Sequence, residues 1–455
     1  MMEKDSARSL AVDLLTEWEE KQAYSNLLLN QALRHAKLSP RDKGLVTELF
    51  YGTIQRLNTI DWVLNQLVKK GVHTLEAWVR QVLRISIYQL LFLDKIPERA
   101  VVHEAVQYSK NRSHKGIAGL VNGVLRGFLR RSEALTPPAQ PQTHAEQSLT
   151  YSFPKWMIQH MEDAYGVTET QQWLADSLLP PQLSVRINTS KISRQAFIEL
   201  WNQSEKGVAR ASTVTQDGVI LSGSGNPAYS ELFEIGYFTI QDESSMLVGE
   251  ILAPTPDMTV LDMCAAPGGK ATHIAQIMEN QGKVVACDLH PHKLALIEAH
   301  IKRLGFTNVR VLSGDSRYIS RKIPNEKFDA ILLDAPCSGL GVIRRKPEIK
   351  WTKKPQHIEG LVRIQAELLE AAAQLLNPGG TLVYSTCTFE KAENQDQVAA
   401  FLKRHPEFEV ALEPQLLPSE VEAKAIFGPG WLQILPHHFH SDGFFIARLH
   451  KRNDI

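Results

Sequence analysis

The second half of the chain alternates short apolar stretches with helical segments. The stretches MTVLDMC, KVVACD, VRVLSGD, FDAILLDAP and GGTLVYSTC are rich in β-branched and other apolar residues. This alternation predicts a mainly parallel sheet with helices on its faces, an α/β fold. Most of the stretches end at an acidic residue or a cysteine. Because ligands of parallel sheets bind at the carboxyl ends of the strands, a functional site is expected there.

The first part of the chain has a different pattern. From Ser6 to about Arg131, apolar residues recur at spacings of three and four, which predicts an all-helical domain. Its last stretch, from Tyr108 to Arg131, carries several basic residues and no acidic one. Charge pattern alone leaves two interpretations open, a solvated helix face or a surface that contacts phosphates.

The division into domains follows from these patterns. A chain of 455 residues is too long for one compact core. Residues 132–148, rich in Pro and Gln, are expected to be a linker, and a mixed helix and strand pattern follows them. We expect a helical domain at 1–135, a small α+β domain at 148–235 and the α/β domain at 236–455.

Composition limits the classes of function. Lys plus Arg and Asp plus Glu are both 50, so any binding of RNA by this chain would need positive charge that is concentrated locally. A secretory signal and an apolar run of membrane-spanning length are both missing, so we expect a cytoplasmic protein without a membrane partner. The four cysteines form no C-x-x-C pair, which argues against a metal site. The reducing environment of a cytosol argues against a structural disulfide.

A glycine-containing loop follows the strand that ends at Asp262. The loop runs from Met263 to Lys270 with the sequence MCAAPGGK, and a helix is expected directly after it. Small residues let a backbone turn approach a ligand closely, and the helix start favours polar groups. Asp288 ends the next strand, at a spacing that suits hydrogen bonds from ribose hydroxyls, and Asp315 ends the third. A tight turn with capping carboxylates explains each motif singly, but three strand ends in register favour an adenosine-type ligand.

Two further strand ends contain cysteines, in LLDAPCSG and YSTCT. Together with DMCAAPGGK and the terminal LPHHFHSDGFFIARL, they resemble the cytosine-5 RNA methyltransferases of the NOL/NOP/Sun class, and within it the bacterial Fmu/Sun/RsmB type. The resemblance implies an all-α NusB-like N-terminal domain, a small α+β linker domain and a C-terminal Rossmann-like class I methyltransferase domain. It also implies S-adenosyl-L-methionine as cofactor, 16S rRNA as partner and a monomer.

The resemblance assigns roles to individual residues. Cys387 is the nucleophile that adds to carbon 6 of cytosine, since carbon 5 is too electron-poor to attack a methyl sulfonium unaided. Cys337 helps to remove the carbon 5 proton, Asp334 contacts the base, and Lys270 is an electrostatic partner. The residues implied to bind the cofactor are Cys264, Ala265, Ala266, Pro267, Gly268, Gly269, Lys270, Asp288, Asp315 and Asp334. Ala271 and Thr388 depart from the family pattern without removing a reacting group.

Three alternatives stay open. The chain could be a non-catalytic NusB-like RNA-binding or ribosome assembly factor, although its loop and cysteines are intact. An amino-group methyltransferase would need no thiol, and the DAPC motif argues against it. The basic stretch from Arg344 to Lys354 is interpreted as a phosphate-holding segment beside the pocket, with a solvated mobile loop as the other interpretation.

Overall fold

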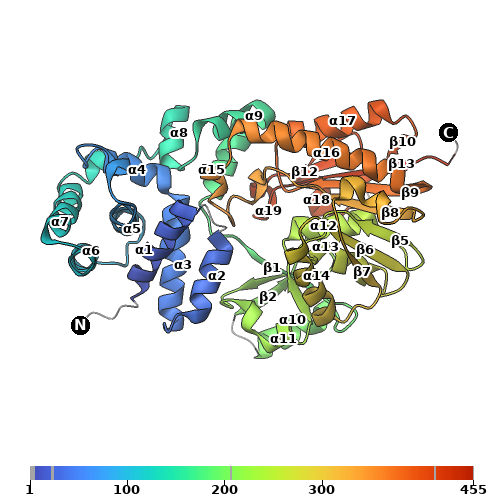
Figure 1. The fold of residues 1–455 in the computed structure, drawn as a ribbon, viewed down its shortest axis with the longest axis horizontal. Coiled ribbons are helices and arrows are strands. Elements are labelled where there is room, and N and C mark those ends of the chain that lie inside the picture. The colour runs from blue at the N-terminus through green and yellow to red at the C-terminus, as the bar shows by residue number, and fades with distance from the viewer. Residues whose placement is uncertain (1–5, 22–24, 205–206, 415–416, 454–455) are drawn as a thin grey trace. The chain divides into compact units, whose positions relative to one another are not determined.

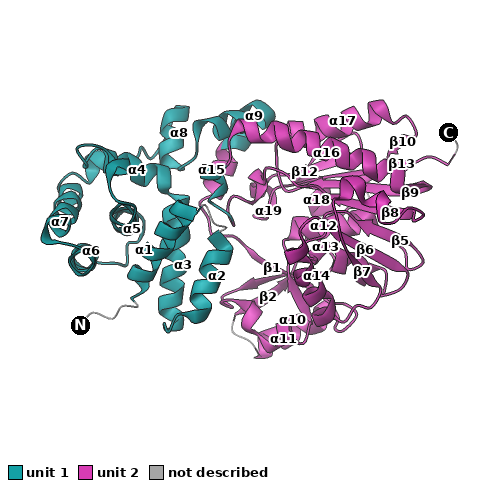
Figure 2. Ribbon diagram, viewed as in Figure 1, with its two compact units in different colours: residues 1–170, 346–352 teal, residues 171–345, 353–455 magenta. Residues whose placement is uncertain are grey.

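The structure is a computed structural model that describes residues 6–21, 25–204, 207–414 and 417–453. It divides into two compact units (Figure 2). Unit 1 comprises residues 1–170 and 346–352, and unit 2 comprises residues 171–345 and 353–455. Among the described helices, we find none that is both long and apolar enough to cross a membrane.

Unit 1 is helical, as expected from the apolar spacing (Figure 1). A single apolar core, which includes Leu15, Phe50, Leu83 and Leu125, is shared by its N-terminal helices. The elements are α1 (Ala7–Lys21), α2 (Ser25–His35), α3 (Pro40–Gln55), α4 (Leu57–Asn65), α5 (Ala77–Phe92), α6 (Glu98–Arg112), α7 (Lys115–Arg130), α8 (His144–Thr150), most of α9 (Lys155–Asp176) and the short α15 (Ile349–Thr352).

The expected linker at 132–148 is partly wrong, because α8 begins inside it. The Thr143 side chain accepts a hydrogen bond from the Glu146 backbone N–H, and Glu146 accepts one from the Thr143 N–H. This reciprocal capping box satisfies N–H groups that a helix start otherwise leaves unpaired. The capping box stabilises the start of α8, a helix that the Pro-rich and Gln-rich composition does not predict.

Unit 2 contains a small antiparallel sheet in the order β2-β3-β1-β4. Its strands are β1 (Leu183–Ile187), β2 (Val208–Ala211), β3 (Gly218–Ser222) and β4 (Phe238–Ile240), with α10 (Arg194–Ser204) and α11 (Glu231–Glu234). Phe197, Trp201 and Phe238 pack their rings together in a separate core. This part confirms the expected small α+β domain.

The larger sheet of unit 2 has the order β11-β12-β13-β9-β8-β5-β6-β7, and β10 pairs with β13. Strands β5 to β9 are parallel, and β13 runs antiparallel to β9. The strands are β5 (Thr259–Asp262), β6 (Lys283–Asp288), β7 (Val309–Ser313), β8 (Phe328–Asp334), β9 (Leu376–Thr386), β10 (Phe408–Val410), β11 (Ile426–Gly428), β12 (Trp431–Ile434) and β13 (Phe444–Lys451). This confirms the α/β fold, with antiparallel strands added at one edge.

Helices cover both faces of this sheet, so successive strand residues enter opposite cores. Leu261 and Leu333 pack with α16, whereas Val260 and Leu332 pack with α12 and α13. Successive side chains of a β-strand point to opposite faces of the sheet, which explains this alternation. Because both faces are buried, the strand sequences are continuous apolar runs. The helices of unit 2 are α12 (Glu243–Leu252), α13 (Gly269–Ile277), α14 (Pro291–Leu304), α16 (Pro355–Leu375), α17 (Gln395–Arg404), α18 (Ser419–Lys424) and α19 (Pro436–Phe439).

Candidate active site

The register of the parallel strands brings the polar strand ends to one edge of the sheet. Asp262 pairs with Ala286 on one side and with Leu332 on the other, and Asp334 pairs with Ser385. Asp288, at the end of β6, pairs with Ser313. The carboxylates of three adjacent strands therefore end at the same edge, as the sequence predicts.

The loop between β5 and α13 folds tightly at this edge. The Ala265 N–H donates to Cys287 O at 2.8 Å, and the peptide bond between Ala266 and Pro267 is cis. Gly268 has φ +105°, and a Cβ there would lie 3.1 Å from the Ile297 Cα of α14. Both the left-handed backbone and the close approach of α14 require glycine at this position.

Two of the predicted carboxylates are held in different ways. Asp288 accepts hydrogen bonds from the N–H groups of Ala266 (3.2 Å) and His290 (3.0 Å). The first of these bonds fixes the backbone of the loop between β5 and α13. Asp315 caps the following 3-10 turn and forms an ion pair with Arg317 at 2.7 Å. The hydrogen bonds from Arg317 lower the pKa of Asp315.

Asp262 is fully buried, and its Oδ2 has no hydrogen-bond partner among the described residues. Burial, together with the charge of Asp334, raises the pKa of Asp262 to about 7. A buried carboxylate oxygen without a donor is costly to keep. Its position directly before the loop suits a ligand that brings its own donor, such as the α-ammonium group of an amino acid.

Lys270, in the first turn of α13, reaches across to Asp334 at the end of β8. The Lys270 Nζ lies 2.7 Å from Asp334 Oδ2, and the Ser385 hydroxyl donates to the other carboxylate oxygen at 2.9 Å. Burial alone lowers the pKa of Lys270, but the Asp334 carboxylate and, more weakly, Cys387 raise it overall. The ammonium therefore stays charged, and it lies 4.9 Å from the centre of the Phe444 ring.

The two cysteines of the strand-end motifs meet at this edge. Cys337 Sγ lies 3.4 Å from Cys387 Sγ, which is hydrogen-bond distance for thiols, and both cysteines are free. The hydrogen bond with Cys387, together with burial, raises the pKa of Cys337 well above its usual range. Cys337 therefore keeps its proton at neutral pH and can donate it in a hydrogen bond to the Cys387 sulfur.

The other two cysteines have surroundings that oppose thiolate formation. Burial and nearby carboxylates, Asp262 foremost, raise the pKa of Cys264 well above its usual range. Cys287 is fully buried in the core, and burial raises its pKa to about 11. Both thiols therefore keep their protons at neutral pH.

Comparison with known proteins shows which family the chain resembles. Residues 249–450 match a family model described as 16S rRNA methyltransferase RsmB/F. Residues 5–130 match the NusB family, and residues 153–226 match the ferredoxin-like domain of RsmF/B-like methyltransferases. The probable ribosomal RNA small subunit methyltransferase B of Bacillus subtilis (strain 168) is 43% identical over 99% of this chain and 100% of its own length. The chain belongs to the RsmB/F methyltransferase family.

Further relatives agree. The ribosomal RNA small subunit methyltransferase B of Klebsiella pneumoniae (strain 342) is 34% identical over the full length of both chains. A crystal structure of PH0851 superposes with a TM-score of 0.83 at 28% identity, and covers 98% of this chain and 99% of that one. NSun6 from Pyrococcus horikoshii, solved with SFG, has a TM-score of 0.57 at 27% identity, over 67% of this chain and 100% of that one.

The sequence patterns did not predict a role for Glu393, a buried carboxylate that binds the residue after Cys337. Glu393 is fully buried, and its Oε2 accepts hydrogen bonds from the Ser338 N–H and the Gln365 side chain, both at 2.9 Å. The Glu393 carbonyl accepts a hydrogen bond from the Tyr384 hydroxyl. These bonds fix the backbone next to Cys337. The sequence signal was weak, because Glu393 lies in a polar stretch, FEKAENQD, and is not itself part of a strand-end motif.

The first two residues of the segment 344–354, interpreted as phosphate-holding, form ion pairs with carboxylates of the chain itself. Arg345 forms ion pairs with Asp242 at 2.7 Å and Asp442 at 3.0 Å. Arg344 lies 3.0 Å from Asp176, and its side chain is only 4% exposed. These guanidinium groups are occupied by carboxylates from distant parts of the sequence, which a local charge pattern cannot reveal.

Lys350 departs from the same interpretation. Its side chain is buried in unit 1, and its Nζ donates to Gln55 O at 2.6 Å. The indole N–H of Trp351 donates to Ile54 O at 2.7 Å. Both residues therefore bind the end of α3 within unit 1.

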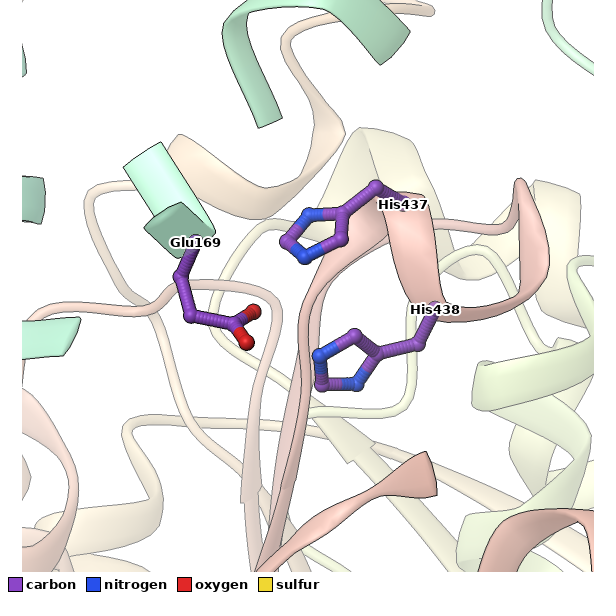
Figure 3. Close-up of side chains that lie close together, drawn as sticks. All are labelled: Glu169, His437 and His438. Carbon is purple, nitrogen blue, oxygen red and sulfur yellow. The ribbon is translucent and has the colours of Figure 1, made fainter. Parts of the chain in front are cut away.

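His437 and His438 are neighbours on α19, with ring centres 4.8 Å apart (Figure 3). The Leu435 N–H donates to His438 Nδ1 at 3.3 Å, so one ring nitrogen caps the helix. Glu169, the third side chain drawn, belongs to the other unit. Two adjacent histidines offer fewer protein ligands than structural or catalytic zinc sites use, and we assign no metal to them.

Proposed function

We propose that this RsmB/F methyltransferase transfers a methyl group to carbon 5 of a cytosine in 16S rRNA, with Cys387 as a covalent nucleophile. The observation that supports this most directly is the pair of thiols 3.4 Å apart at the ends of β8 and β9. An amino-group methyltransferase has no use for such a pair. The charged partners Lys270 and Asp334 lie at the same edge.

The proposal includes S-adenosyl-L-methionine as methyl donor, because a relative of similar fold was solved with its analogue SFG. The residues proposed to hold it are those of the loop 264–270, Asp288, Asp315 and Asp334. Asp262 Oδ2, which has no partner in the described part of the chain, fits the ammonium group of such a ligand. When bound, the sulfonium supplies an electrophilic methyl group.

The first chemical role belongs to Cys387. Its sulfur, as a thiolate, adds to carbon 6 of cytosine, and the electrons of the carbon 5–carbon 6 double bond then make carbon 5 nucleophilic. The Cys337 thiol can hydrogen-bond the Cys387 thiolate, and the Lys270 ammonium favours a negative sulfur nearby. Asp334 is oriented by Lys270 and Ser385 to contact the amino group or ring nitrogen 3 of the base.

The second role belongs to Cys337. Once carbon 5 carries the methyl group, Cys337 as a thiolate accepts the carbon 5 proton. The electrons of that bond re-form the carbon 5–carbon 6 double bond, and the Cys387–carbon 6 bond breaks to return a thiolate. The hydrogen bond with Cys387 is the largest cause that raises the pKa of Cys337. Bonding of Cys387 to the base removes that cause, so Cys337 loses its own proton more easily at that stage.

Transfer of a labelled methyl group tests the proposal. Incubation with labelled S-adenosylmethionine and small-subunit RNA should label carbon 5 of a cytosine, and Cys387→Ala should abolish the label. Cys337→Ala should instead trap an enzyme–RNA adduct that is stable on denaturing gels. Label that survives Cys387→Ala would refute the nucleophile assignment, and a Cys337→Ala enzyme without an adduct would refute the release role.

The proposal also covers domains, partners and place of action. We propose an RNA-binding helical domain at 1–135, an RNA-binding α+β domain at 148–235 and a methyltransferase domain at 236–455, acting as a monomer in the cytoplasm. Naked 16S rRNA and a partly assembled small subunit are both candidate substrates. Labelling of each in parallel would distinguish them.

A further inference from the structure

Unit 2 contains a cavity that includes none of the proposed catalytic or cofactor-binding residues. Its volume is about 460 Å³. It is lined by residues 179–183 before and at the start of β1, Arg210 of β2, residues 220–225 around the end of β3, Arg344 and His440. It thus lies where the small sheet adjoins two loops of the methyltransferase sheet.

The described lining of this cavity is basic. Arg210, Arg344 and His440 contribute to it, and no carboxylate is among the described lining residues. Asp176 forms an ion pair with Arg344, and its other oxygen contacts His440 Nδ1. One carboxylate therefore contacts two basic side chains, and Arg210 adds a positive charge that this carboxylate does not neutralise.

Arg210 is the exposed cation of the cavity. Its Nη2 donates a long hydrogen bond of 3.4 Å to Gln182 Oε1. The nearby carboxyl group of Glu243 is buried, and burial raises its pKa. The burial therefore weakens the electrostatic attraction between Glu243 and the Arg210 guanidinium. The Arg210 guanidinium is thus available to an anion. In a chain of zero net charge, such a local excess is the condition for binding phosphate.

The loop after β3 adds hydrogen-bond donors. Its sequence is Ser222-Gly223-Ser224-Gly225, and both glycines have positive φ, +71° and +67°. Glycines in this conformation are typical of turns whose N–H groups bind anions. The Ser224 hydroxyl is buried and has no hydrogen-bond partner within the described part of the chain. It is a donor without an acceptor, next to basic side chains.

One rim of the cavity is apolar. Leu179 is 51% exposed, and the exposed Pro180 and Pro181 follow it. Apolar surface beside basic groups suits a nucleotide, whose sugar and base can pack on it while the phosphate meets the cations. A small inorganic anion would not need this rim.

We propose that this cavity binds a phosphodiester group of the substrate RNA strand, with Arg210 and the 222–225 loop as its main contacts. The inference rests on the proposed RNA methyltransferase function and extends it to a binding site away from the reacting atoms. Arg344 follows Cys337 by seven positions, so its Cα lies within about 25 Å of the Cys337 Cα. One RNA strand can span that distance, with the target base in the catalytic site and another nucleotide here.

Charge-changing variants of the full-length protein test the site. Arg210→Gln removes the exposed cation, and Ser222→Glu adds a negative charge, with Ser222→Gln as its neutral control of equal size. Arg452→Gln removes a comparably exposed arginine elsewhere in unit 2 and controls for net charge. RNA affinity is measured with fluorescent small-subunit RNA over a series of salt concentrations, and S-adenosylmethionine affinity by calorimetry reports the integrity of unit 2.

Arg210→Gln is expected to bind RNA about threefold to tenfold more weakly than Arg452→Gln does. Ser222→Glu is expected to bind RNA more weakly than its neutral control Ser222→Gln does. The slope of log affinity against log salt should fall by about 0.7 to 1 for Arg210→Gln. KM for RNA should rise while kcat stays the same. Equal RNA affinities of Arg210→Gln and Arg452→Gln would overturn the inference.

Two further outcomes separate this inference from the proposed function. A wild-type protein that binds RNA through Arg210 but methylates no cytosine would refute the proposed function and leave this site intact. Inorganic phosphate is titrated alone as a second probe. Tight binding of phosphate that Arg210→Gln abolishes, with RNA affinity unchanged, would assign the cavity to a free anion and overturn the RNA assignment.

Discussion

At the scale of single residues, Asp262 has the most unusual environment of the site. The fold buries this carboxyl group directly before the loop 263–270, with one oxygen unpaired among the described residues. Burial is the main cause of its pKa of about 7, compared with about 4 for an exposed aspartate. The native state therefore binds this proton more tightly than the unfolded state does. The contribution of Asp262 to stability is present below pH 4 and is lost as pH rises to 7.

Asp262→Asn should remove this pH dependence. At pH 8 the ligand-free variant should be more stable than the wild type by about 1 kcal/mol or more, roughly 2 °C or more in Tm, with little difference at pH 4. S-adenosylmethionine should bind more weakly, because the amide lacks the carboxylate charge. Thermal unfolding at both pH values and calorimetry check the two effects. A variant less stable than wild type at pH 8 would show that the carboxylate is satisfied in the native protein.

The residues of the site differ in how far the sequence revealed them. Cys337, Cys387 and Lys270 lie in short motifs next to strand ends, and parallel pairing brings such ends together whatever the loops do. Glu393 has no such signal, because its partners Ser338 and Gln365 come from a loop and a helix remote in sequence. Local patterns report local geometry, and contacts of this range depend on the finished fold.

At the scale of elements, ion pairs of Arg345 fix the segment that follows Cys337 in the sequence. Arg345 binds Asp242 at the start of α12 and Asp442 before β13, and Gln182 O accepts a further hydrogen bond from it at 2.8 Å. The Asp442 N–H also donates to Asp242. One arginine thus connects three separate segments to the loop that follows Cys337, the proposed proton acceptor. Periodicity predicted the strands and helices well, but it could not predict these connections between them.

Arg345→Met should destabilise unit 2, because it leaves two buried carboxylates side by side. Loss of one partner of a buried ion pair costs about 3 kcal/mol or more. Urea unfolding should show this loss. The double variant Arg345→Met with Asp442→Asn should recover part of it, since one of the two charges is gone. A double variant as unstable as the sum of both single variants would contradict the proposed repulsion.

At the scale of the whole molecule, the chain passes from one compact unit to the other three times. Residues 346–352 belong to unit 1 although they lie in the sequence between two parts of unit 2. The surrounding sequence motifs predict that these residues belong to the methyltransferase domain. Their unit is decided by Lys350 and Trp351, which donate to Gln55 and Ile54 carbonyls, and by Lys350 Nζ, which lies 4.4 Å from the centre of the Phe153 ring.

Trp351→Phe tests this attachment, because it keeps an aromatic ring and removes the indole N–H that Ile54 O accepts. The lost hydrogen bond leaves a carbonyl at the end of α3 without that donor, which should cost about 1 kcal/mol. Segment 346–352 should then open more often, with faster amide hydrogen exchange there and unchanged exchange in strands β5 to β9. Lys346→Ala, an exposed change in the same segment, is the control and should leave exchange unaltered. Because Cys337 and Lys346 are separated by only nine positions, a looser segment should also lower kcat more than it raises KM for RNA. Unchanged exchange in Trp351→Phe would mean that the attachment depends on apolar packing and the Lys350 contact rather than on the indole hydrogen bond.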